Sequence, residues 1–452
     1  MPTVQRVGGN DWRTALLLAV ADAVILLAAG LAATWIRFGP ALFETELGEI
    51  LSHPGFLVYF LLAQLGLATT FDLYRQASWR TKDYLLVRMA ALAVSMAVAL
   101  ALGVYMVPGW RFGRGLLALT LVFALPLEAA IRFLWLAVAA RPQPRRALVI
   151  GSGPIVGALE EELERRPNPP FMIAQHLPAP SETSTPENIA EALHDADLVV
   201  VASLAHDPTV DRLAALNFRG TPVMDAAGAY AALTGRIPVR QVDSRWFIAT
   251  GDFSSIATSP FHHLQRFFDL GISSVLLLLS SPVLIVAALA TLVSDGNPIF
   301  YRQVRLGRFA KPFTLFKLRT MTRDADATGP TFVEPNDKRV LPVGRFLRRW
   351  RIDELPQLIN VLRGDMSLVG PRPERVDVAE KLERQIPFYA FRYSVRPGLT
   401  GWAQVHLPYC ELPEEHVEKL EFDLYMLRHY GPAMYGVVLT RTLGALIFRP
   451  GQ

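Results

Sequence analysis

Asp353 and Glu354 are adjacent acids in a segment whose chemistry a protein core does not require. An ionised carboxylate can attack phosphorus as a nucleophile or bind Mg²⁺ as a ligand. Apolar residues recur at intervals of three and four across Leu355–Leu362, which predicts an amphipathic helix that Gly364 ends. The acids therefore lie at a helix entry, where free N–H groups and the dipole favour negative charge. An acid pair is also an ordinary helix start, so the neighbouring segments must decide between the two interpretations.

Three cationic side chains follow patterns that suit phosphate oxygens. Arg372 lies between two prolines, which restrict the backbone on both sides and present the guanidinium in a fixed direction. The residues Phe313–Met321 are strand-like, and their alternation places Lys317 and Arg319 on one face, where they could bracket a diphosphate. Two cations on an edge strand could equally be simple solvent contacts.

Four motifs from about Phe261 to the C-terminus resemble those of the bacterial sugar transferases, also called polyprenyl-phosphate hexose-1-phosphate transferases. The motifs follow the family's order and are Lys317–Met321, Asp353–Leu358, Gly364–Pro373 and Arg396–Gln404. The N-terminal half resembles the four-helix, nucleotide-fold extension of the family's long members.

The resemblance implies a phosphoglycosyl transferase reaction. A hexose 1-phosphate would move from a UDP-hexose to a polyprenyl phosphate, such as undecaprenyl phosphate, with release of UMP. The product would begin the membrane assembly of an exopolysaccharide, capsule or O-antigen. Asp353 would form a covalent sugar-phosphate intermediate, and Glu354 would hold the cofactor Mg²⁺. Three further catalytic side chains would stabilise the transition-state oxygens: Lys317, Arg319 and Arg372.

The resemblance also implies substrate-binding residues near the C-terminus. Arg396 opens a turn-rich loop that Trp402 and Gln404 follow. Trp402 could stack on the nucleotide base or pack in the core. Asp423 lies in a helical stretch at a position where the family carries an aspartate. Where the family commonly has a further aspartate, this chain has Tyr435, so no role is expected from that carboxylate.

The composition agrees with a membrane enzyme that handles phosphorylated substrates. The 452 residues allow two or three domains, and a hydrophobic share of 51% points to membrane segments. The sole cysteine, Cys410, excludes an internal disulfide framework and fits a reducing compartment. The net charge of +4 is small, but basic residues cluster beside apolar runs. This pattern indicates membrane lipids as partners and no nucleic acid.

Residues 1–140 contain four apolar runs that predict a four-helix transmembrane region. The runs are about Ala15–Ile36, Phe56–Thr70, Leu85–Val107 and Leu116–Ala139. Three reach the roughly 20 residues of a span, and the second is marginal. Cations such as Arg75, Arg80 and Arg141 follow the second and fourth runs, whereas acids dominate the first connection. Although arginines in the third connection weaken the inference, we expect a multi-pass protein of the bacterial inner (cytoplasmic) membrane with a cytoplasmic catalytic domain.

Residues 141–250 predict a small Rossmann-like α/β domain. A buried strand leads into a turn with Gly151, Gly153 and Gly157 and then a helix, which is a context that suits nucleotide binding. The glycine spacing departs from the dinucleotide pattern, and the next strand, Phe171–His176, lacks an acid for a ribose. The sequence favours a retained fold with a structural or regulatory role over a nucleotide site.

Residues 251–452 predict a monotopic catalytic domain that contains an apolar run at about residues 267–293. Ser281 and Pro282 interrupt this run, and a proline removes a hydrogen bond and kinks a helix. A run that crosses would place Asp353 outside, away from cytosolic nucleotides, whereas a run that returns keeps both flanks inside. Basic residues on both flanks favour the return, so we expect a re-entrant helix, with an ordinary kinked span as the alternative.

Two other functions compete with sugar-phosphate transfer. Four membrane helices and a glycine turn suit a membrane-bound nucleotide-sugar epimerase or dehydratase, but that chemistry usually uses a Tyr-x-x-x-Lys pair, which this chain lacks. A non-catalytic scaffold for polysaccharide assembly would explain the membrane segments but not Asp353 and Glu354. The identity of the sugar, the polyprenyl length and the oligomeric state, a homodimer included, are left open.

Overall fold

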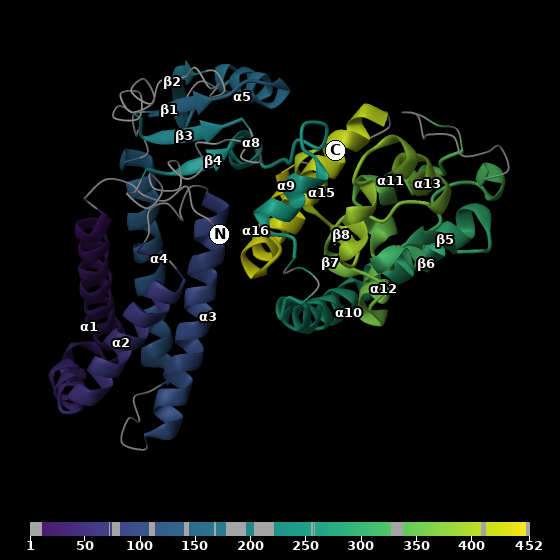
Figure 1. Ribbon diagram of the computed structural model, residues 1–452. Helices are drawn as coiled ribbons and strands as arrows, with labels where there is room; N and C mark the ends of the chain where they lie inside the picture. Colours follow the sequence, from purple (N-terminus) through teal and green to yellow (C-terminus); the bar gives the residue numbers. More distant parts are fainter. Residues whose placement is uncertain are drawn as a thin grey trace. The chain divides into compact units, whose positions relative to one another are not determined.

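The chain folds into two compact units, Pro2–Gln143 and Pro144–Gln452 (Figure 1). The computed structural model describes residues 11–71, 73–74, 82–107, 114–139, 144–166, 169–177, 196–202, 221–254, 256, 258–326, 337, 339–407 and 413–448. Arg75, Arg80 and Arg141, on which the predicted membrane orientation depends, lie outside these residues, as does Cys410.

The first unit is a bundle of four helices at the positions of the four apolar runs. They are α1 (Asp11–Leu51), α2 (Pro54–Thr70), α3 (Lys82–Met106) and α4 (Arg114–Ala139). Three of them are long and apolar enough to cross a membrane, and α2 is shorter with 17 residues. The connection after the first run is helical as far as Leu51, because Gly39 at φ 71° turns the chain and Pro40 begins a new helical segment.

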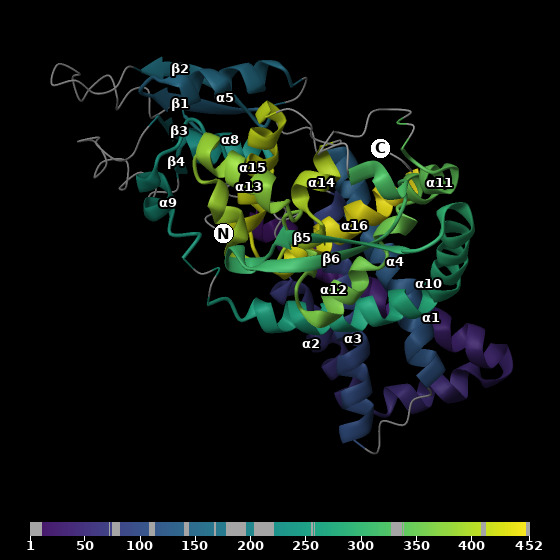
Figure 2. The ribbon, with the colours of Figure 1, turned by 90° about the vertical axis from the view of Figure 1, so that its right-hand side faces the viewer.

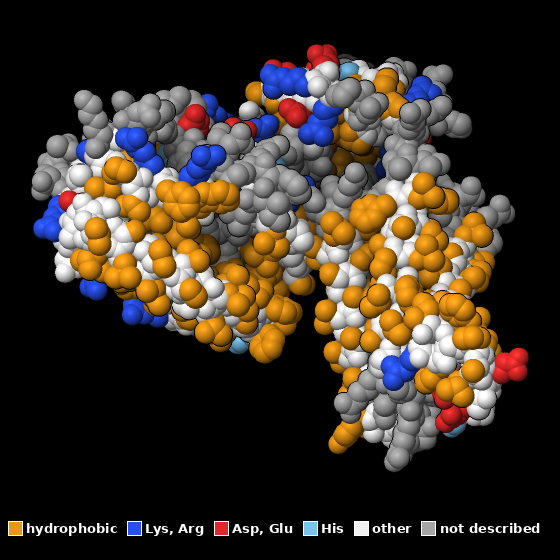
Figure 3. Space-filling view, turned by 180° about the vertical axis from the view of Figure 1, so that it is seen from behind, with side chains coloured by type: hydrophobic (Ala, Val, Ile, Leu, Met, Phe, Trp, Pro, Cys, Tyr) orange, Lys and Arg blue, Asp and Glu red, His pale blue; other side chains and the backbone are white. Residues whose placement is uncertain are grey.

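Apolar side chains form both the inside and the outside of this bundle. Leucine, methionine and phenylalanine fill its interior, and its surface also carries many exposed hydrophobic side chains (Figure 3). The interior holds two polar pairs. Arg132 donates to both carboxylate oxygens of Asp22 at 2.8 and 2.6 Å, and Gln64 donates to Glu128 at 2.9 and 2.8 Å. Such pairing is what charged and polar groups require in an apolar surrounding.

The second unit begins with a four-stranded parallel sheet. Its strands are β1 (Arg145–Ile150), β2 (Phe171–Leu177), β3 (Leu198–Val201) and β4 (Val223–Asp225), in the order β2-β1-β3-β4. The strand β2 covers the strand that the sequence predicts at Phe171–His176. Two helices, α5 (Pro154–Glu164) and α8 (Ala226–Thr234), pack together over one apolar face of the sheet.

The chain after α8 already belongs to the core of the C-terminal body, by which we mean the elements from α9 to α16. Ile237, Val239 and Phe247 pack in one apolar cluster with residues near the C-terminus, such as Leu420 and Leu424. The backbone N–H of Ile237 also donates to the carbonyl of Glu421 at 3.1 Å, while Arg236 pairs with Glu418 at 2.5 Å. The apolar core is therefore continuous across residue 250, where the sequence predicts a domain boundary.

The C-terminal body is rich in helices and holds two small strand pairs. Its helices are α9 (Ser244–Thr250), α10 (Phe261–Asp295), α11 (Pro342–Arg349), α12 (Gln357–Arg363), α13 (Val376–Gln385), α14 (Trp402–His406), α15 (Pro413–Arg428) and α16 (Pro432–Phe448). The strands β5 (Phe300–Leu306) and β6 (Pro312–Leu318) form an antiparallel hairpin, and β7 (Ser367–Val369) pairs in parallel with β8 (Gly398–Thr400).

The pairing of β7 with β8 brings two of the sequence motifs into backbone contact. A Cβ atom at Gly370 would lie 2.3 Å from the carbonyl oxygen of Arg396, and one at Gly398 would lie 2.1 Å from the nitrogen of Gly370. No side chain fits at such distances, so the glycines in both motifs allow the two segments to touch.

Helix α10 contains 35 residues with Pro282 inside, and its two halves run in different directions (Figure 2). Proline has no N–H to donate to the carbonyl of Leu278, and the hydroxyl of Ser281 donates to that oxygen at 2.7 Å instead. Much of the helix is exposed and apolar, with Leu278 at 74% and Val293 at 87%. This surface requires an apolar environment.

Both ends of α10 contact other elements of the C-terminal body. Near its start, Arg266 donates to the backbone carbonyls of Val361 and Leu362 in α12. At its end, Asp295 pairs with Arg319 at 2.8 Å. The two elements that hold the ends, β6 with the residue after it and α12, also contact each other.

Candidate active site

The acid pair lies on a short turn between two helices. The turn η4 (Ile352–Glu354) follows α11 and precedes α12, and Pro356 caps the latter helix. Arg351 enters the turn at φ 52°, in the left-handed region that side chains rarely adopt. The sequence predicts the acids at the entry of this helix, and the structure adds a separate turn that fixes their direction.

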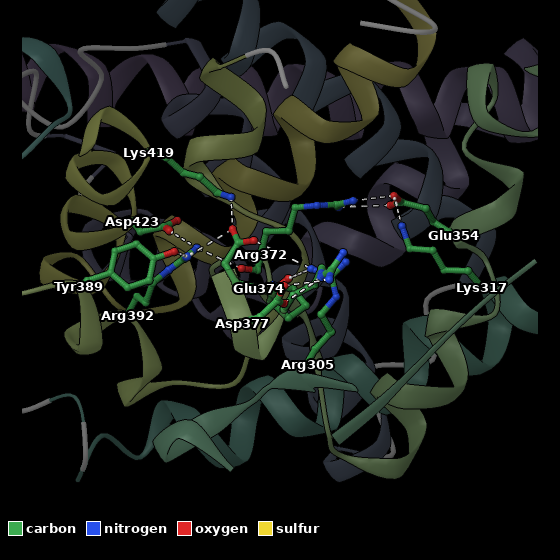
Figure 4. A network of polar contacts seen from close by, with 12 residues as sticks. Arg305, Lys317, Glu354, Arg372, Glu374, Asp377, Tyr389, Arg392, Lys419 and Asp423 are labelled. Atoms are coloured by element: carbon green, nitrogen blue, oxygen red, sulfur yellow. Dashed lines mark hydrogen bonds and ion pairs between the residues drawn. The ribbon is translucent and has the colours of Figure 1, made fainter. Parts of the chain in front are cut away.

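Three segments bring their charges together at Glu354 (Figure 4). Lys317 of β6 donates to Oε1 of Glu354 at 3.0 Å. Arg372, from the loop after β7, donates to Oε1 at 2.8 Å and to Oε2 at 3.5 Å. The predicted residues Lys317, Glu354 and Arg372 thus form one cluster, with Asp353 adjacent in the turn.

The two acids have opposite electrostatic environments although each is only 7% exposed. Burial and the charge of Glu354 raise the pKa of Asp353 to about 6, with Lys317 and Arg348 acting in the other direction. Burial would also raise the pKa of Glu354, but Arg372 and Lys317 hold it well below its usual range. In the part of the chain that the structure describes, no donor is hydrogen-bonded to the Asp353 carboxylate. Glu354 is therefore a paired anion, and Asp353 is an acid that accepts no hydrogen bond from the described residues.

Sequence reasoning missed two cations beside the pair. Arg348 of α11 lowers the pKa of Asp353, and Arg351 lowers that of Glu354. The sequence shows both within one or two turns of the acids, but α11 is strongly amphipathic and its arginines also suit a lipid headgroup layer. Arg348 donates to the hydroxyl of Thr320 at 2.8 Å, which directs it toward the body.

Arg319 has different partners from Lys317. Its guanidinium is only 6% exposed and binds Asp295 and the carbonyl oxygens that end α10. Arg319 directly follows β6, and its backbone N–H donates to the carbonyl of Ile299 at 2.9 Å. In this structure its side chain holds the end of α10, and the expectation that Lys317 and Arg319 bracket one diphosphate stays a prediction.

Two of the expected substrate contacts are buried. Trp402 is 5% exposed, and its indole N–H donates to the carbonyl of Gly235 at 3.0 Å, which supports the packing interpretation. Asp423 is fully buried and accepts from Arg392 at 2.7 Å. Neither side chain faces solvent, so direct substrate contact by either is not supported.

The other two expected contacts are more accessible. Arg396 donates through Nε to the carbonyl of Gly364 at 3.1 Å, and the residue is partly exposed. Gln404 donates to the carbonyl of Leu399 at 3.1 Å. Their role toward a substrate stays a prediction.

The glycine turn of the sheet has a structural explanation at one position. Gly151 adopts φ 92°, and a Cβ there would lie 2.9 Å from Cβ of Ala202. Gly153 caps α5 at φ 148°, whereas a Cβ at Gly157 would meet open space. Nucleotide binding at this turn stays a prediction.

The acid pair fits Mg²⁺ that arrives with a diphosphate. The described residues hold no group of three His, Cys, Asp or Glu side chains of the kind that forms an all-protein site. Mg²⁺ commonly uses one or two carboxylates together with substrate phosphates and water. Asp353 and Glu354 supply two adjacent carboxylates, and a cation would relieve the repulsion that raises the pKa of Asp353.

Comparison with known proteins adds an independent result. Residues 261–449 match the family model described as bacterial sugar transferase. This segment contains the whole acid and arginine cluster.

Three curated relatives agree. The chain is 32% identical over 227 residues to a UDP-N-acetylgalactosamine-undecaprenyl-phosphate N-acetylgalactosaminephosphotransferase from Aeromonas hydrophila, covering 50% of this chain and 52% of that one. It is 42% identical over 169 residues to a UDP-glucose:undecaprenyl-phosphate glucose-1-phosphate transferase from Escherichia coli K12, covering 37% and 36%. A putative undecaprenyl-phosphate N-acetylgalactosaminyl 1-phosphate transferase from Bacillus subtilis 168 is 41% identical over 135 residues, covering 30% of this chain and 75% of the relative. The matched part thus spans about half or less of the first two relatives.

Proposed function

The chain belongs to the bacterial sugar transferase family, and we propose that it transfers a hexose 1-phosphate from a UDP-hexose to a polyprenyl phosphate with release of UMP. The names of the relatives support this substrate pair. The observation that carries the proposal is the contrast between Glu354, which accepts from Lys317 and Arg372, and Asp353, to which no described donor is hydrogen-bonded. A nucleophile needs accessible lone pairs, and no described donor occupies those of the Asp353 carboxylate.

We propose a covalent route through Asp353. An oxygen of its carboxylate attacks the phosphorus that bears the sugar, and the bond from that phosphorus to the UMP oxygen breaks. The sugar phosphate is then held on the aspartate. An oxygen of the polyprenyl phosphate attacks the same phosphorus, which forms the lipid diphosphate and returns the Asp353 carboxylate. This division into two displacements suits a carboxylate nucleophile.

Arg372 and Lys317 have the position to bind the charge that moves during both displacements. Their ion pairs with Glu354, at 2.8 and 3.0 Å, place both cations beside Asp353 before a substrate arrives. Donors that are fixed in advance stabilise developing negative charge without reorganising. The fork of Arg372 suits two oxygens of one phosphate, whereas Lys317 acts as a point charge.

Mg²⁺ would supply charge neutralisation on the diphosphate and would be held by Glu354. Lys317 and Arg372, which pair with Glu354, lie where they could also bind the phosphate oxygens of the substrate.

We propose that α10 is re-entrant and sets the site at the cytoplasmic surface of the inner membrane. Support comes from Pro282, from the exposed apolar surface of the helix and from the binding of both its ends to one body. A straight helix of 35 residues would extend about 52 Å, which exceeds the bilayer core. A break allows the helix to enter the bilayer and return, so the site stays level with the lipid phosphate.

The proposal is tested by UMP release. Purified protein in nanodiscs is given undecaprenyl phosphate, Mg²⁺ and a panel of UDP-sugars that includes glucose, galactose and N-acetylgalactosamine. We expect one or few of these sugars to yield UMP together with a lipid-linked sugar diphosphate. The absence of both products across the panel would contradict the function.

A further inference from the structure

Four ionisable side chains form a buried cluster next to the loop that carries Arg372 (Figure 4). They are Glu374, Arg392, Lys419 and Asp423, and each is at most 9% exposed. Arg392 donates to Asp423 at 2.7 Å and to Glu374 at 3.5 Å, while Lys419 also pairs with Glu374. None of these four groups takes part in the chemistry proposed above.

A buried charge cluster requires an explanation, because apolar residues of equal volume often stabilise a core as much as buried ion pairs do, or more. Burial would raise the pKa of Glu374, but Lys419 and Arg392 hold it far below its usual range, so the carboxylate stays ionised. Burial raises the pKa of Asp423, and Arg392 and Lys419 act in the other direction. The cluster is a set of polar groups whose hydrogen bonds have defined directions, which apolar side chains could not supply.

The loop that carries Arg372, next to this cluster, has few backbone N–H donors. Pro371 and Pro373 on either side of Arg372 have no N–H, so the loop can be held only through its carbonyl oxygens and the remaining amides. The carbonyl of Arg372 accepts from Arg392 at 3.0 Å, and that of Pro373 accepts from Arg305 at 3.2 Å. Two consecutive carbonyls are thus fixed by two arginine side chains.

We propose that Arg392 and Arg305 are positioning residues that aim the guanidinium of Arg372 at the reacting phosphate, and that Glu374 and Asp423 fix the direction of Arg392. This inference rests on the proposed function, since it assigns a task within that reaction. Figure 4 shows Arg372 extending from the buried cluster at one end to Glu354 at the other. Asp423 then serves the site without touching the substrate.

A double-mutant cycle separates positioning from general stabilisation. The values of kcat and KM for UMP release are measured for wild type, Arg372→Lys, Arg392→Lys and the double variant. We expect Arg372→Lys to lower kcat/KM about 100-fold, because a transition-state donor is lost. Arg392→Lys should lower kcat about tenfold with little change in KM for the UDP-sugar, since a shifted Arg372 acts mainly in the transition state.

The double variant decides the inference. If Arg392 acts through Arg372, the double variant should stay within about twofold of Arg372→Lys alone. Losses that multiply, or a kcat that is unchanged in Arg392→Lys, would overturn positioning. A wild type that releases no UMP would overturn the proposed function and this inference with it, whereas multiplying losses in an active wild type overturn the inference alone.

Two further variants guard against loss of folding. Arg428 pairs with Asp252 at 2.7 Å elsewhere in the C-terminal body, and Arg428→Lys should lower thermal stability without changing kcat. Arg305 is the partly exposed one of the two arginines that bind the loop carbonyls. If Arg392→Lys does not fold, Arg305→Lys takes its place in the double-mutant cycle with Arg372→Lys. Independent losses in the Arg305 and Arg372 variants would likewise contradict the inference.

Discussion

At the scale of residues, two neighbouring carboxylates differ because their surroundings differ. Glu354 accepts hydrogen bonds from Lys317 and Arg372, whereas Asp353 is influenced through space by these two cations, by Arg348 and by the charge of Glu354. The motifs predicted that the two acids, Lys317 and Arg372 act together with Arg319, since the types and the order are specific. The contact of Arg319 with the end of α10 could not be predicted, because strand alternation is a local rule and this contact joins distant segments.

The raised pKa of Asp353 predicts the acid side of the pH profile. Its nucleophilic form is the ionised one, and the pKa is raised to about 6, so kcat/KM should fall as the pH drops through this value. Rates of UMP release between pH 5 and 8 at limiting Mg²⁺ measure this limb. Saturating Mg²⁺ should move it to lower pH, because a cation favours the charged carboxylate.

Glu354→Gln tests the cause of that shift. The neutral amide removes the negative charge that raises the pKa of Asp353, while Lys317 and Arg372 remain. The acid limb should therefore move to lower pH even as the maximal rate falls with weaker Mg²⁺ binding. An unchanged limb would show that the titrating group is not Asp353.

At the scale of elements, the sequence predicted helices and strands correctly where residues that begin or end the element lie in the element itself or next to it. Gly364 at φ 92° ends α12 as the sequence predicts, and β2 covers the strand predicted at Phe171–His176. The helical continuation of α1 to Leu51 was not predicted, because the first apolar run ends at Ile36 and Gly39 and Pro40 are typical of a helix end. In the structure the chain bends at Gly39 and continues as a helix.

The proposed return of α10 predicts that both of its flanks face the cytoplasm. Single cysteines are placed at the exposed residues Thr258 and Arg302 in a chain whose only cysteine, Cys410, is replaced by serine. A membrane-impermeant maleimide should label neither position in intact cells and both in inside-out vesicles. Labelling of the two positions from opposite sides would mean that α10 crosses and that the site placement is wrong.

At the scale of the whole molecule, the core extends beyond the part that carries the motifs. Ile237, Val239 and Phe247 lie before the family match begins at residue 261, yet they share an apolar cluster with α13 and α15. The sequence could not reveal this, because such packing joins residues far apart in the chain and leaves no periodic signal. The same holds for the cluster at Glu374, whose four charges come from three separate segments.

Truncation should show how much the residues before the family match contribute to the thermal stability of the catalytic body. A chain that begins at Pro144 keeps the whole second unit and should retain UMP release in nanodiscs. A chain that begins at Ser259 keeps every motif but loses several buried apolar side chains, each worth about 2 kcal/mol or more. It should unfold at a clearly lower temperature. Equal thermal stability of the two chains would show that residues 221–256 do not support the catalytic body.

The covalent sugar phosphate on Asp353 is the most direct test of the account. Wild-type protein is mixed with the UDP-sugar it uses and Mg²⁺, without polyprenyl phosphate, and is then digested and analysed by mass spectrometry. We predict a mass increase of one hexose phosphate on the peptide that contains Asp353, together with UMP released in an amount close to that of the enzyme. The adduct should disappear when undecaprenyl phosphate is added and should not form in Asp353→Asn. An adduct on another residue, or continued turnover of Asp353→Asn, would contradict the account.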